Sequence, residues 1–294
     1  MLCACIDIGS NTTRVLVAEV DGGTIRPVLE RKAYTELGRD LRAAGAVSDA
    51  RMRVLADVVA DYAATTVRLG VDRTRTVATA AMRGAANRDA VLDCIRERAG
   101  VELEILPGEE EARLAFHGAT RTLPAVPEGS LAVLDVGGGS SEIAVGTAGG
   151  GVSWACSLPI GSSYLAEAHQ RCDPPSADEI AAMREHADSV FAARDDVPRP
   201  AAAAAVGGSA TALCQMGGSV LDGPTLARAA QMVCDGPAEV VARRHGLDAE
   251  RVRLLPAGIL ILDAAARRLG CALQVARGGL REGVCLALAG HAAP

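Results

Sequence analysis

The feature that most constrains this chain is a motif that occurs twice, about one domain apart. Residues 2–14 read LCACIDIGSNTTR, and residues 131–145 read LAVLDVGGGSSEIAV. Each copy is a short apolar run that ends in an Asp, followed by a Gly/Ser turn and a second apolar run. Backbone N–H groups of such a turn can bind phosphate oxygens, and the carboxylate can bind a divalent cation. The repetition predicts two similar halves that face each other across a phosphate site.

The order of expected strands and helices repeats as well. Each half opens with three strands and continues with helices and further strands, and a polar, Pro-rich linker at 121–129 separates the halves. We therefore predict an α/β protein with domains 1–125 and 126–294. The expected strands are 2–8, 13–20, 24–34, 74–79, 101–106, 131–136, 141–146, 152–158, 201–206 and 271–276, and the expected helices are 49–69, 88–99, 108–119, 176–194, 225–246 with a break at Gly236-Pro237, 257–269 and 281–289.

Composition and charge argue against several classes of function. A net charge of −6 argues against a broad nucleic-acid-binding surface, so a polyanion must bind in a local basic cleft. The nine Cys include no C-x-x-C pair and no zinc-like spacing with His, which favours buried thiols in a reducing compartment. No apolar run approaches the ~18 residues of a membrane span, and no leader pattern opens the sequence. We expect a cytoplasmic protein with no nucleic-acid or membrane partner.

The first turn offers phosphate ligands but is a weak signal alone. In residues 7–12, Gly9 permits a tight turn, and Ser10 and Asn11 offer hydrogen-bond donors to phosphate oxygens. Arg14 adds positive charge nearby. An Asx-rich β-turn without function explains the same residues.

The second turn is the stronger signal. Gly137, Gly138 and Gly139 suit a close approach of the backbone to a ligand. Asp135 and Glu142 flank the turn on paired strands, so both carboxylates can meet at one hydrated metal ion. A Gly-rich hairpin with two solvated acids is the alternative, and three consecutive glycines between apolar strands favour the functional interpretation.

Three further segments gain meaning only in combination. Gly208 and Ser209 stand between a strand and a helix start, which can bind an anion or be an ordinary capped helix. Glu111 lies in an acidic first helical turn that suits the helix dipole, but it can also deprotonate a water if that end faces phosphate. Arg83 lies between a strand and a helix, where it can bind phosphate or be a surface Arg.

In this order, the motifs resemble the exopolyphosphatase / guanosine pentaphosphate phosphohydrolase (Ppx/GppA) family in its short two-domain form. The resemblance implies the fold of actin, Hsp70 and the sugar kinases, in which two RNase-H-like α/β domains lie around a central cleft. The matching stretches are DIGSNTTR (7–14), TAAMRGAAN (79–87), LPGEEEARLAFHGA (106–119), LDVGGGSSEIAVG (134–146), VGGSATAL (206–213), LLPAGILIL (254–262) and GGLREG (278–283).

The resemblance also implies roles for individual residues. Glu111 corresponds to the catalytic base, and Asp135 and Glu142 correspond to catalytic acidic residues associated with Mg²⁺ (or Mn²⁺). Asp7 is a further candidate metal ligand. The candidate phosphate-binding residues are Gly9, Ser10, Asn11, Arg83, Gly137, Gly138, Gly139, Ser140, Gly208 and Ser209.

The expected activity is hydrolysis of the terminal phosphate of inorganic polyphosphate or of guanosine pentaphosphate, by a homodimer. The alternatives are a kinase of the same superfamily and a non-catalytic sensor that binds alarmone nucleotides or polyphosphate. Two mild departures from the family pattern are Gly84, where Asp is frequent, and Ser141, where Thr is frequent. The sequence shows no C-terminal helical extension like that of long members and no H-D dipeptide, so we expect a preference for short polyphosphates or nucleotides.

Overall fold

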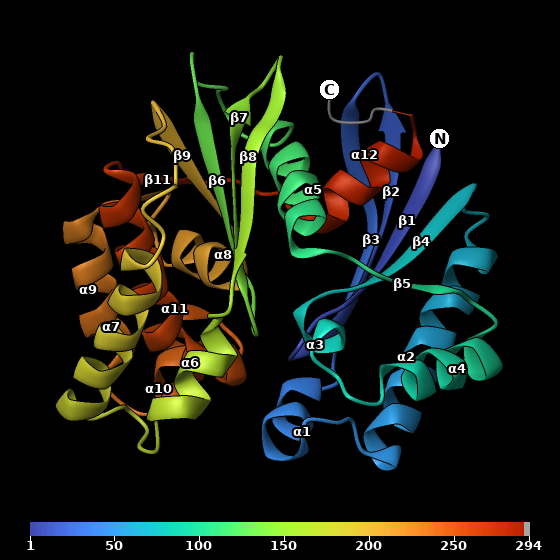
Figure 1. The fold of residues 1–294 in the computed structure, drawn as a ribbon, viewed down its shortest axis with the longest axis horizontal. Helices are drawn as coiled ribbons and strands as arrows, with labels where there is room; N and C mark the ends of the chain where they lie inside the picture. The colour runs from blue at the N-terminus through green and yellow to red at the C-terminus, as the bar shows by residue number, and fades with distance from the viewer. Residues whose placement is uncertain (291–294) are drawn as a thin grey trace. The chain divides into compact units, whose positions relative to one another are not determined.

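The computed structural model describes residues 1–290, which form two compact α/β units (Figure 1). Unit 1 contains Met1–Arg121 together with residues 278–290. Unit 2 contains Thr122–Arg277. Each unit has a mixed β-sheet and its own apolar core, which confirms the α/β prediction.

These units differ from the expected domains, 1–125 and 126–294, at the C-terminal end. After Arg277 the chain returns to unit 1 and forms the helix α12 (Leu280–Leu288). Apolar side chains of α12, among them Val284 and Cys285, are buried in a core of unit 1, and this burial explains the return. The expected domain end at 294 lies outside the described residues.

The strands of unit 1 form a sheet in the order β3-β2-β1-β4-β5. The neighbours β3, β2 and β1 are antiparallel, whereas β1, β4 and β5 run parallel to one another. The strands are β1 (Leu2–Ile8), β2 (Thr12–Asp21), β3 (Thr24–Tyr34), β4 (Arg73–Ala78) and β5 (Leu103–Ile105), and the helices other than α12 are α1 (Leu37–Ala44), α2 (Asp49–Arg68), α3 (Ala80–Arg83), α4 (Arg88–Ala99) and α5 (Gly108–Thr120).

The sheet of unit 2 has the order β10-β11-β9-β6-β7-β8. Here β8, β7 and β6 are antiparallel neighbours, and β6, β9 and β11 are parallel. The strands are β6 (Leu131–Val136), β7 (Ser141–Thr147), β8 (Gly151–Leu158), β9 (Ala202–Gly207), β10 (Val220–Leu221) and β11 (Leu273–Val275), and the helices are α6 (Ser162–His169), α7 (Ala177–Ala192), α8 (Gly208–Gln215), α9 (Gly223–Val233), α10 (Ala238–His245) and α11 (Ala249–Leu269).

The two sheets therefore repeat one topology. The order and directions of β8-β7-β6-β9-β11 match those of β3-β2-β1-β4-β5, and β10 is an addition at one edge. In both units the first strand is central, and its C-terminal end leads into the Gly/Ser turn. This is the repeated architecture that the two motif copies predict.

Alternation along β1 explains how its sheet is covered on both faces. Cys3 and Cys5 pack on one face with residues of α5 and α12, whereas Ala4 and Ile6 pack on the other face with Tyr62 of α2. Successive side chains of a strand point to opposite faces, so a strand buried on both sides must be apolar throughout. This pattern places α12 and α2 on opposite faces of the same sheet.

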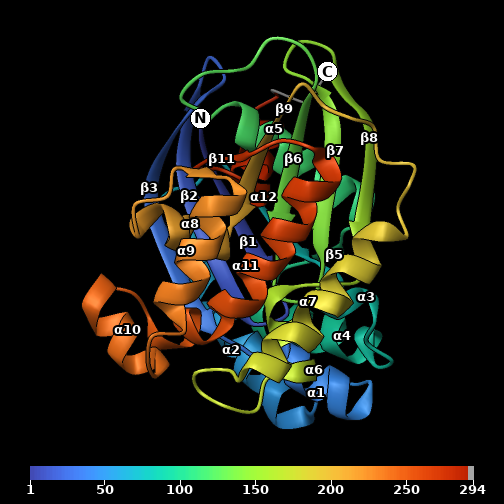
Figure 2. The same ribbon diagram turned by 90° about the vertical axis from the view of Figure 1, so that its left-hand side faces the viewer.

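The long helix α11 is central to unit 2 (Figure 2). It contacts α6, α7, α8, α9 and α10, and most of its apolar side chains are buried. The sequence predicts a helix over 257–269. In the structure, the helix begins eight residues earlier, at Ala249, and continues through Pro256. Asp248 caps it by accepting a hydrogen bond from the Glu250 N–H.

The break expected within 225–246 at Gly236-Pro237 is confirmed, because α9 ends before it and Pro237 caps the start of α10. Other elements differ from expectation. The short elements α1, α3, α6 and β10 were not expected from the sequence. Hydrophobic periodicity is a weak guide for elements of two to eight residues, since they bury few side chains. Among residues 1–290, no helix combines the length and the apolar character needed to cross a bilayer.

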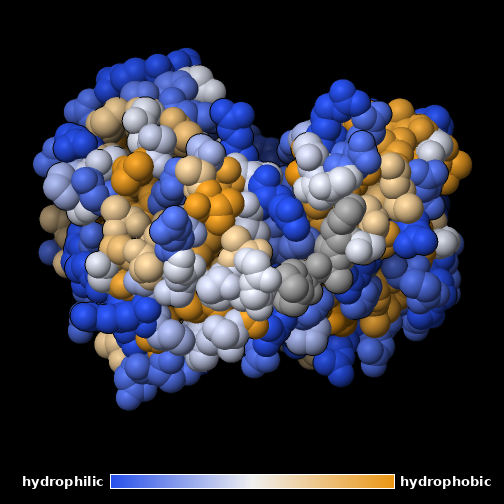
Figure 3. All heavy atoms as spheres, turned by 90° about the horizontal axis from the view of Figure 1, so that it is seen from above, coloured by the Kyte–Doolittle hydropathy of each residue, from blue (hydrophilic) through white to orange (hydrophobic). Residues whose placement is uncertain are grey.

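The visible surface mixes polar and apolar side chains. On the face seen in Figure 3, hydrophobic residues are interspersed with hydrophilic ones in both units. The large apolar side chains that are exposed, such as Val28, Val54 and Val220, come from separate elements. Scattered exposure of this kind is normal for globular proteins.

Candidate functional site

The first Gly/Ser turn connects β1 to β2. Backbone N–H groups at and just before the start of α1 hold it by hydrogen bonds to its carbonyl oxygens. The Gly9 N–H donates to the carbonyl oxygen of Thr12 at 3.0 Å, and a Cβ on Gly9 would lie 3.1 Å from that oxygen. The Ser10 carbonyl accepts from the Gly38 N–H at 2.8 Å, and the Asn11 carbonyl accepts from the N–H groups of Thr35 and Glu36. These bonds occupy the carbonyls of the turn, which would otherwise repel an anion.

Asp7 lies at the base of this turn, where β1 ends. Its Oδ1 is buried and has no hydrogen-bond partner within the described residues. Burial raises the pKa of Asp7, and the positive charges of Arg281 and Arg14 oppose that shift. A buried carboxylate oxygen without a donor fits a cation, since burial of an uncompensated charge is costly. The role of Asp7 as a metal ligand stays a prediction.

Arg83 and Glu111 meet although they come from different helices of unit 1. The Arg83 Nη1 lies 2.6 Å from the Glu111 Oε2 and 3.0 Å from the carbonyl oxygen of Leu106. Glu111 is only 6% exposed, in the first turn of α5, and Arg83 ends the short helix α3. The structure therefore brings the predicted base into contact with the predicted phosphate-binding Arg.

The second Gly/Ser turn connects β6 to β7 in unit 2. The Gly137 N–H donates to the Ser140 carbonyl at 3.0 Å, and a Cβ on Gly137 would lie 2.9 Å from the same oxygen. The N–H groups of Ser162 and Tyr164, at the start of α6, donate to the carbonyls of Gly137 and Gly138. As in the first turn, an adjacent helix start satisfies carbonyls of the loop.

Residues flanking the two turns correspond in register but differ in charge. Asp7 is paired with Arg14 across β1 and β2, and Asp135 is paired with Glu142 across β6 and β7. Directly opposed residues of antiparallel strands place their side chains on the same face. Opposite charges therefore flank the first turn, whereas two acids flank the second, and the second turn is the stronger attractor for a cation.

Glu142 is held by hydroxyl groups. It is 1% exposed, and its Oε1 accepts hydrogen bonds from the Ser140 Oγ at 2.6 Å and the Ser157 Oγ at 2.7 Å. The Ser140 hydroxyl thus donates to Glu142, and phosphate binding by Ser140 stays a prediction. Ser157 was not among the sequence-based candidates, because it lies on β8 and nothing in its own segment marks it.

The third loop approaches the same acidic pair. Gly207 ends β9 with φ +94°, and a Cβ there would lie 2.8 Å from the Asp135 Oδ1. Only glycine combines this positive φ with so close an approach to Asp135. The parallel pairing of β6 with β9 sets Val136 beside Gly207, so the ends of β6, β7 and β9 meet at one edge of the sheet.

Gly208 and Ser209 have different surroundings from those that the sequence predicts. A Cβ on Gly208 would lie 2.4 Å from the Arg251 Nη2, so this glycine allows the guanidinium of α11 to reach the loop. Ser209 is fully buried, and its Oγ faces Gly258 of α11 without a hydrogen-bond partner in the described chain. Its side chain thus points into the core of unit 2. Sequence reasoning missed Arg251, although its position two helical turns before Gly258 places both on one side of α11.

The acidic pair fits a magnesium ion. Mg²⁺ prefers oxygen ligands and is usually bound by one or two carboxylates together with substrate phosphates and water. Asp135 and Glu142 supply such carboxylates on one face of the sheet. In the described part of the chain, no group of three or more His, Cys, Asp or Glu side chains is arranged for a metal ion. Most ligands of a metal here must therefore be phosphate or water oxygens.

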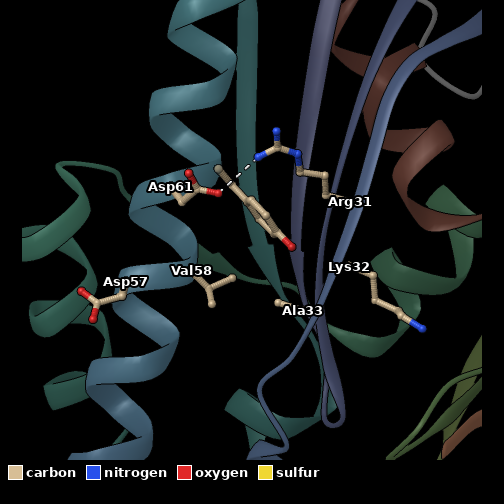
Figure 4. Close-up of a pocket in the computed structure, with 7 residues that line it drawn as sticks. Arg31, Lys32, Ala33, Asp57, Val58 and Asp61 are labelled. Atoms are coloured by element: carbon tan, nitrogen blue, oxygen red, sulfur yellow. Dashed lines mark hydrogen bonds and ion pairs between the residues drawn. The ribbon is translucent and has the colours of Figure 1, made fainter.

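A separate pocket of about 490 Å³ lies between β3 and α2 in unit 1 (Figure 4). The ion pair between Arg31 and Asp61, 3.4 Å apart, lies at this pocket. None of the predicted site residues lines it, and in Figure 4 the Lys32 ammonium points away from Val58. We assign it no part in the candidate site.

Comparisons with known proteins agree with the motif order. Residues 16–292 match the sequence model of the Ppx/GppA phosphatase family. An uncharacterised protein of Streptomyces coelicolor is 37% identical over 211 residues. The match covers 69% of this chain and 62% of that protein, so the chain spans less than two thirds of that relative's length. Exopolyphosphatase 1 of Mycobacterium tuberculosis is 28% identical over 305 residues, which cover 97% of this chain and 88% of that protein.

Solved structures of relatives share the fold. A Ppx/GppA family member from Aquifex aeolicus is 28% identical, with a TM-score of 0.83, over 98% of this chain and 97% of that one. An exopolyphosphatase from Cytophaga hutchinsonii has a TM-score of 0.87 at 21% identity, over 99% of this chain and 98% of that one. The second likeness concerns the fold alone.

Proposed function

Because the chain belongs to the Ppx/GppA phosphatase family, we propose that it releases orthophosphate from the end of inorganic polyphosphate or from guanosine pentaphosphate. The observation that carries this proposal is the contact between Arg83 and Glu111. It joins a guanidinium, which binds phosphate oxygens, to a buried carboxylate that can accept a proton from water. Water is then the acceptor of the phosphoryl group.

The reaction breaks one phosphoanhydride bond and forms one P–O bond to water. Glu111 accepts a proton from the attacking water, and the leaving phosphate takes up a proton from solvent. In unit 1, Arg83 and the backbone N–H groups of the first Gly/Ser turn would bind phosphate oxygens, and in unit 2 the N–H groups of the second turn offer the same kind of donor. Asp135 and Glu142 would hold Mg²⁺, which neutralises phosphate charge when bound.

Substrate binding has a consequence for the ion pair. Arg83 contacts Glu111 at 2.6 Å through Nη1, and its other N–H groups can donate to phosphate. A terminal phosphate carries more negative charge than one carboxylate and therefore competes for the guanidinium. A shift of Arg83 toward phosphate would weaken its contact with Glu111 and make the carboxylate a better proton acceptor for water. The substrate itself thus prepares the base.

A phosphate-release assay tests the proposal directly. The substrates are polyphosphates of increasing length and guanosine pentaphosphate, each with Mg²⁺ and with a chelator. Release that depends on Mg²⁺ supports the proposal. Binding of these ligands without release would favour a sensor, and turnover of a nucleoside triphosphate only with an added acceptor would favour a kinase. The homodimer that the resemblance implies stays a prediction for sedimentation equilibrium.

A further inference from the structure

Two glycines mark a close crossing of α5 and α12 in unit 1. A Cβ on Gly283 would lie 1.9 Å from the carbonyl oxygen of Leu114, and one on Gly118 would lie 2.0 Å from that of Gly279. These distances leave no space for a side chain at either of these two positions. Figure 1 shows the two helices in contact, and they make extensive contacts along their length.

This crossing lies on the stripe of α5 that contains Glu111. Leu114 and Gly118 follow Glu111 by three and seven residues, which places all three on one side of the helix. Three residues correspond to about 4.5 Å of helix rise, so Glu111 lies within one turn of the contact. A displacement of α5 at Leu114 must therefore also move Glu111.

The first turn of α5 has no side-chain cap. Its N-cap residue is Pro107, whose side chain has no hydrogen-bond acceptor. The tight contact between Arg83 and Glu111, at 2.6 Å, tolerates only a small shift of the helix. Packing along the rest of α5 therefore contributes to where this turn lies.

α12 is well fixed on the sheet. Its Glu282 is buried, and the Oε2 accepts a hydrogen bond from the Gly279 N–H at 2.7 Å. Arg281 lies 3.4 Å from Glu30 of β3, and Val284 and Cys285 are fully buried against the sheet. Because α12 is held by charge, capping and apolar burial, it is a firm surface for α5 to rest on.

We propose that Gly118 and Gly283 are positioning residues, which set the place of Glu111 by letting α12 contact the backbone of α5. This inference rests on the proposed function, in which Glu111 is the base. It assigns a role in the site to the GGLREG segment, residues 278–283, which lies 167 or more positions after Glu111 in the sequence.

The test is a comparison of G283A with G236A, in wild type and in E111Q. A Cβ added to Gly236 would meet no described atom within 4 Å, and the φ of Gly236 is not positive, so G236A is the matched control. With Glu111 present, G283A is expected to lower kcat by about 10²-fold, since a misplacement of about 1 Å has such an effect. KM is expected to change by less than about threefold, because a loss confined to the reacting geometry appears mainly in kcat. G236A leaves both unchanged.

The E111Q background separates positioning from a merely structural role. If Gly283 acts through Glu111, G283A has little further effect on the residual rate of E111Q. An equal loss of rate in both backgrounds, or a rise in KM without loss of kcat, overturns the inference. Near-normal turnover of E111Q with a normal wild type instead overturns the assignment of the base, which belongs to the proposed function.

A second variant covers failure of G283A to fold. V284A removes two methyl groups from the buried face of α12 and adds no atom. It is expected to loosen α12 on the sheet and to lower kcat in the wild type but not further in E111Q. A V284A protein that is destabilised yet has unchanged kcat contradicts the role of α12 in positioning.

Discussion

Arg83 of α3 and Glu111 of α5, 28 residues apart in the sequence, form an ion pair at 2.6 Å. The Glu111 side chain is 8% exposed and the Arg83 side chain 25% exposed. A carboxylate buried to this degree needs a compensating charge or hydrogen bond. The Arg83 guanidinium supplies that charge, and the pair places two expected reaction partners of a phosphate group together.

E111Q is expected to reduce phosphate release by about 10²–10⁴-fold while substrate binding changes little, since the amide cannot accept a proton. The control is E109Q, an exposed acid in the same first turn of α5. Steady-state kinetics with one polyphosphate and with guanosine pentaphosphate give both parameters. Near-normal turnover of E111Q would transfer the role of base to another group, with Glu142 the next candidate.

R83M is expected to weaken substrate binding and to destabilise unit 1 by about 1–3 kcal/mol, because Glu111 keeps its charge without the guanidinium. In the double variant R83M/E111Q, the neutral amide is expected to restore part of the lost stability. Urea unfolding of the four proteins gives the coupling energy of the pair. Strictly additive effects of the two substitutions would show that the contact contributes nothing to stability.

D7N is expected to be more stable than the wild type at neutral pH and equally stable in acid. The pKa of Asp7 is raised above its ordinary value of 3.8, mainly by burial. The folded state therefore binds the proton more tightly, and the wild type loses stability as the pH rises from the unfolded pKa through the folded pKa. Asparagine has no such loss. Thermal unfolding at pH 3.5 and pH 7 measures the difference, with D195N, an exposed Asp, as control.

A benefit of D7N at pH 3.5 equal to that at pH 7 would assign the effect to packing rather than to ionisation. The same protein is expected to lose activity, because the carboxylate that destabilises the fold is a candidate cation ligand. A more stable but less active variant is a known outcome when a site residue is neutralised.

Chelation of divalent ions is expected to abolish phosphate release, and added Mg²⁺ to restore it. D135N and E142Q are each expected to raise the Mg²⁺ concentration needed for half-maximal activity by about tenfold or more. Each substitution removes one of the two carboxylates that would bind the ion. D178N, in the first turn of α7, is the control. Full activity of the wild type in excess chelator would exclude the assigned metal role of this pair.

The ratio kcat/KM is expected to be highest for short polyphosphates or guanosine pentaphosphate. A long polyphosphate has about one negative charge per phosphate, and a protein with a net charge of −6 repels it away from local basic residues. Many Arg side chains are already paired with acids, as Arg75 is with Glu104 and Arg267 with Asp188. A steady rise of kcat/KM up to chains of hundreds of phosphates would contradict a short binding track.

Local features of the sequence determined the strands, the turns and the repeated architecture. A strand that ends in Asp, followed by Gly and Ser and a second strand, specifies a tight connection through neighbouring residues only, because glycine permits the turn and apolar runs favour strands. Residues 7–14 and 135–142 therefore indicated both the duplication and the acidic pair, and the structure has Asp135 directly opposite Glu142.

Only the tertiary structure decided which side chains of the candidate site contact side chains from other helices and strands. The contact of Arg83 with Glu111, the hydroxyl bonds from Ser140 and Ser157 to Glu142, and the burial of Ser209 against Gly258 join separate elements. The return of α12 to unit 1 also depends on apolar burial between distant segments. The hydrophobic effect is non-directional, so it does not depend on how far apart two segments lie in the sequence. Which segments pack together is decided by the shape of the folded core, and no local sequence pattern specifies that shape.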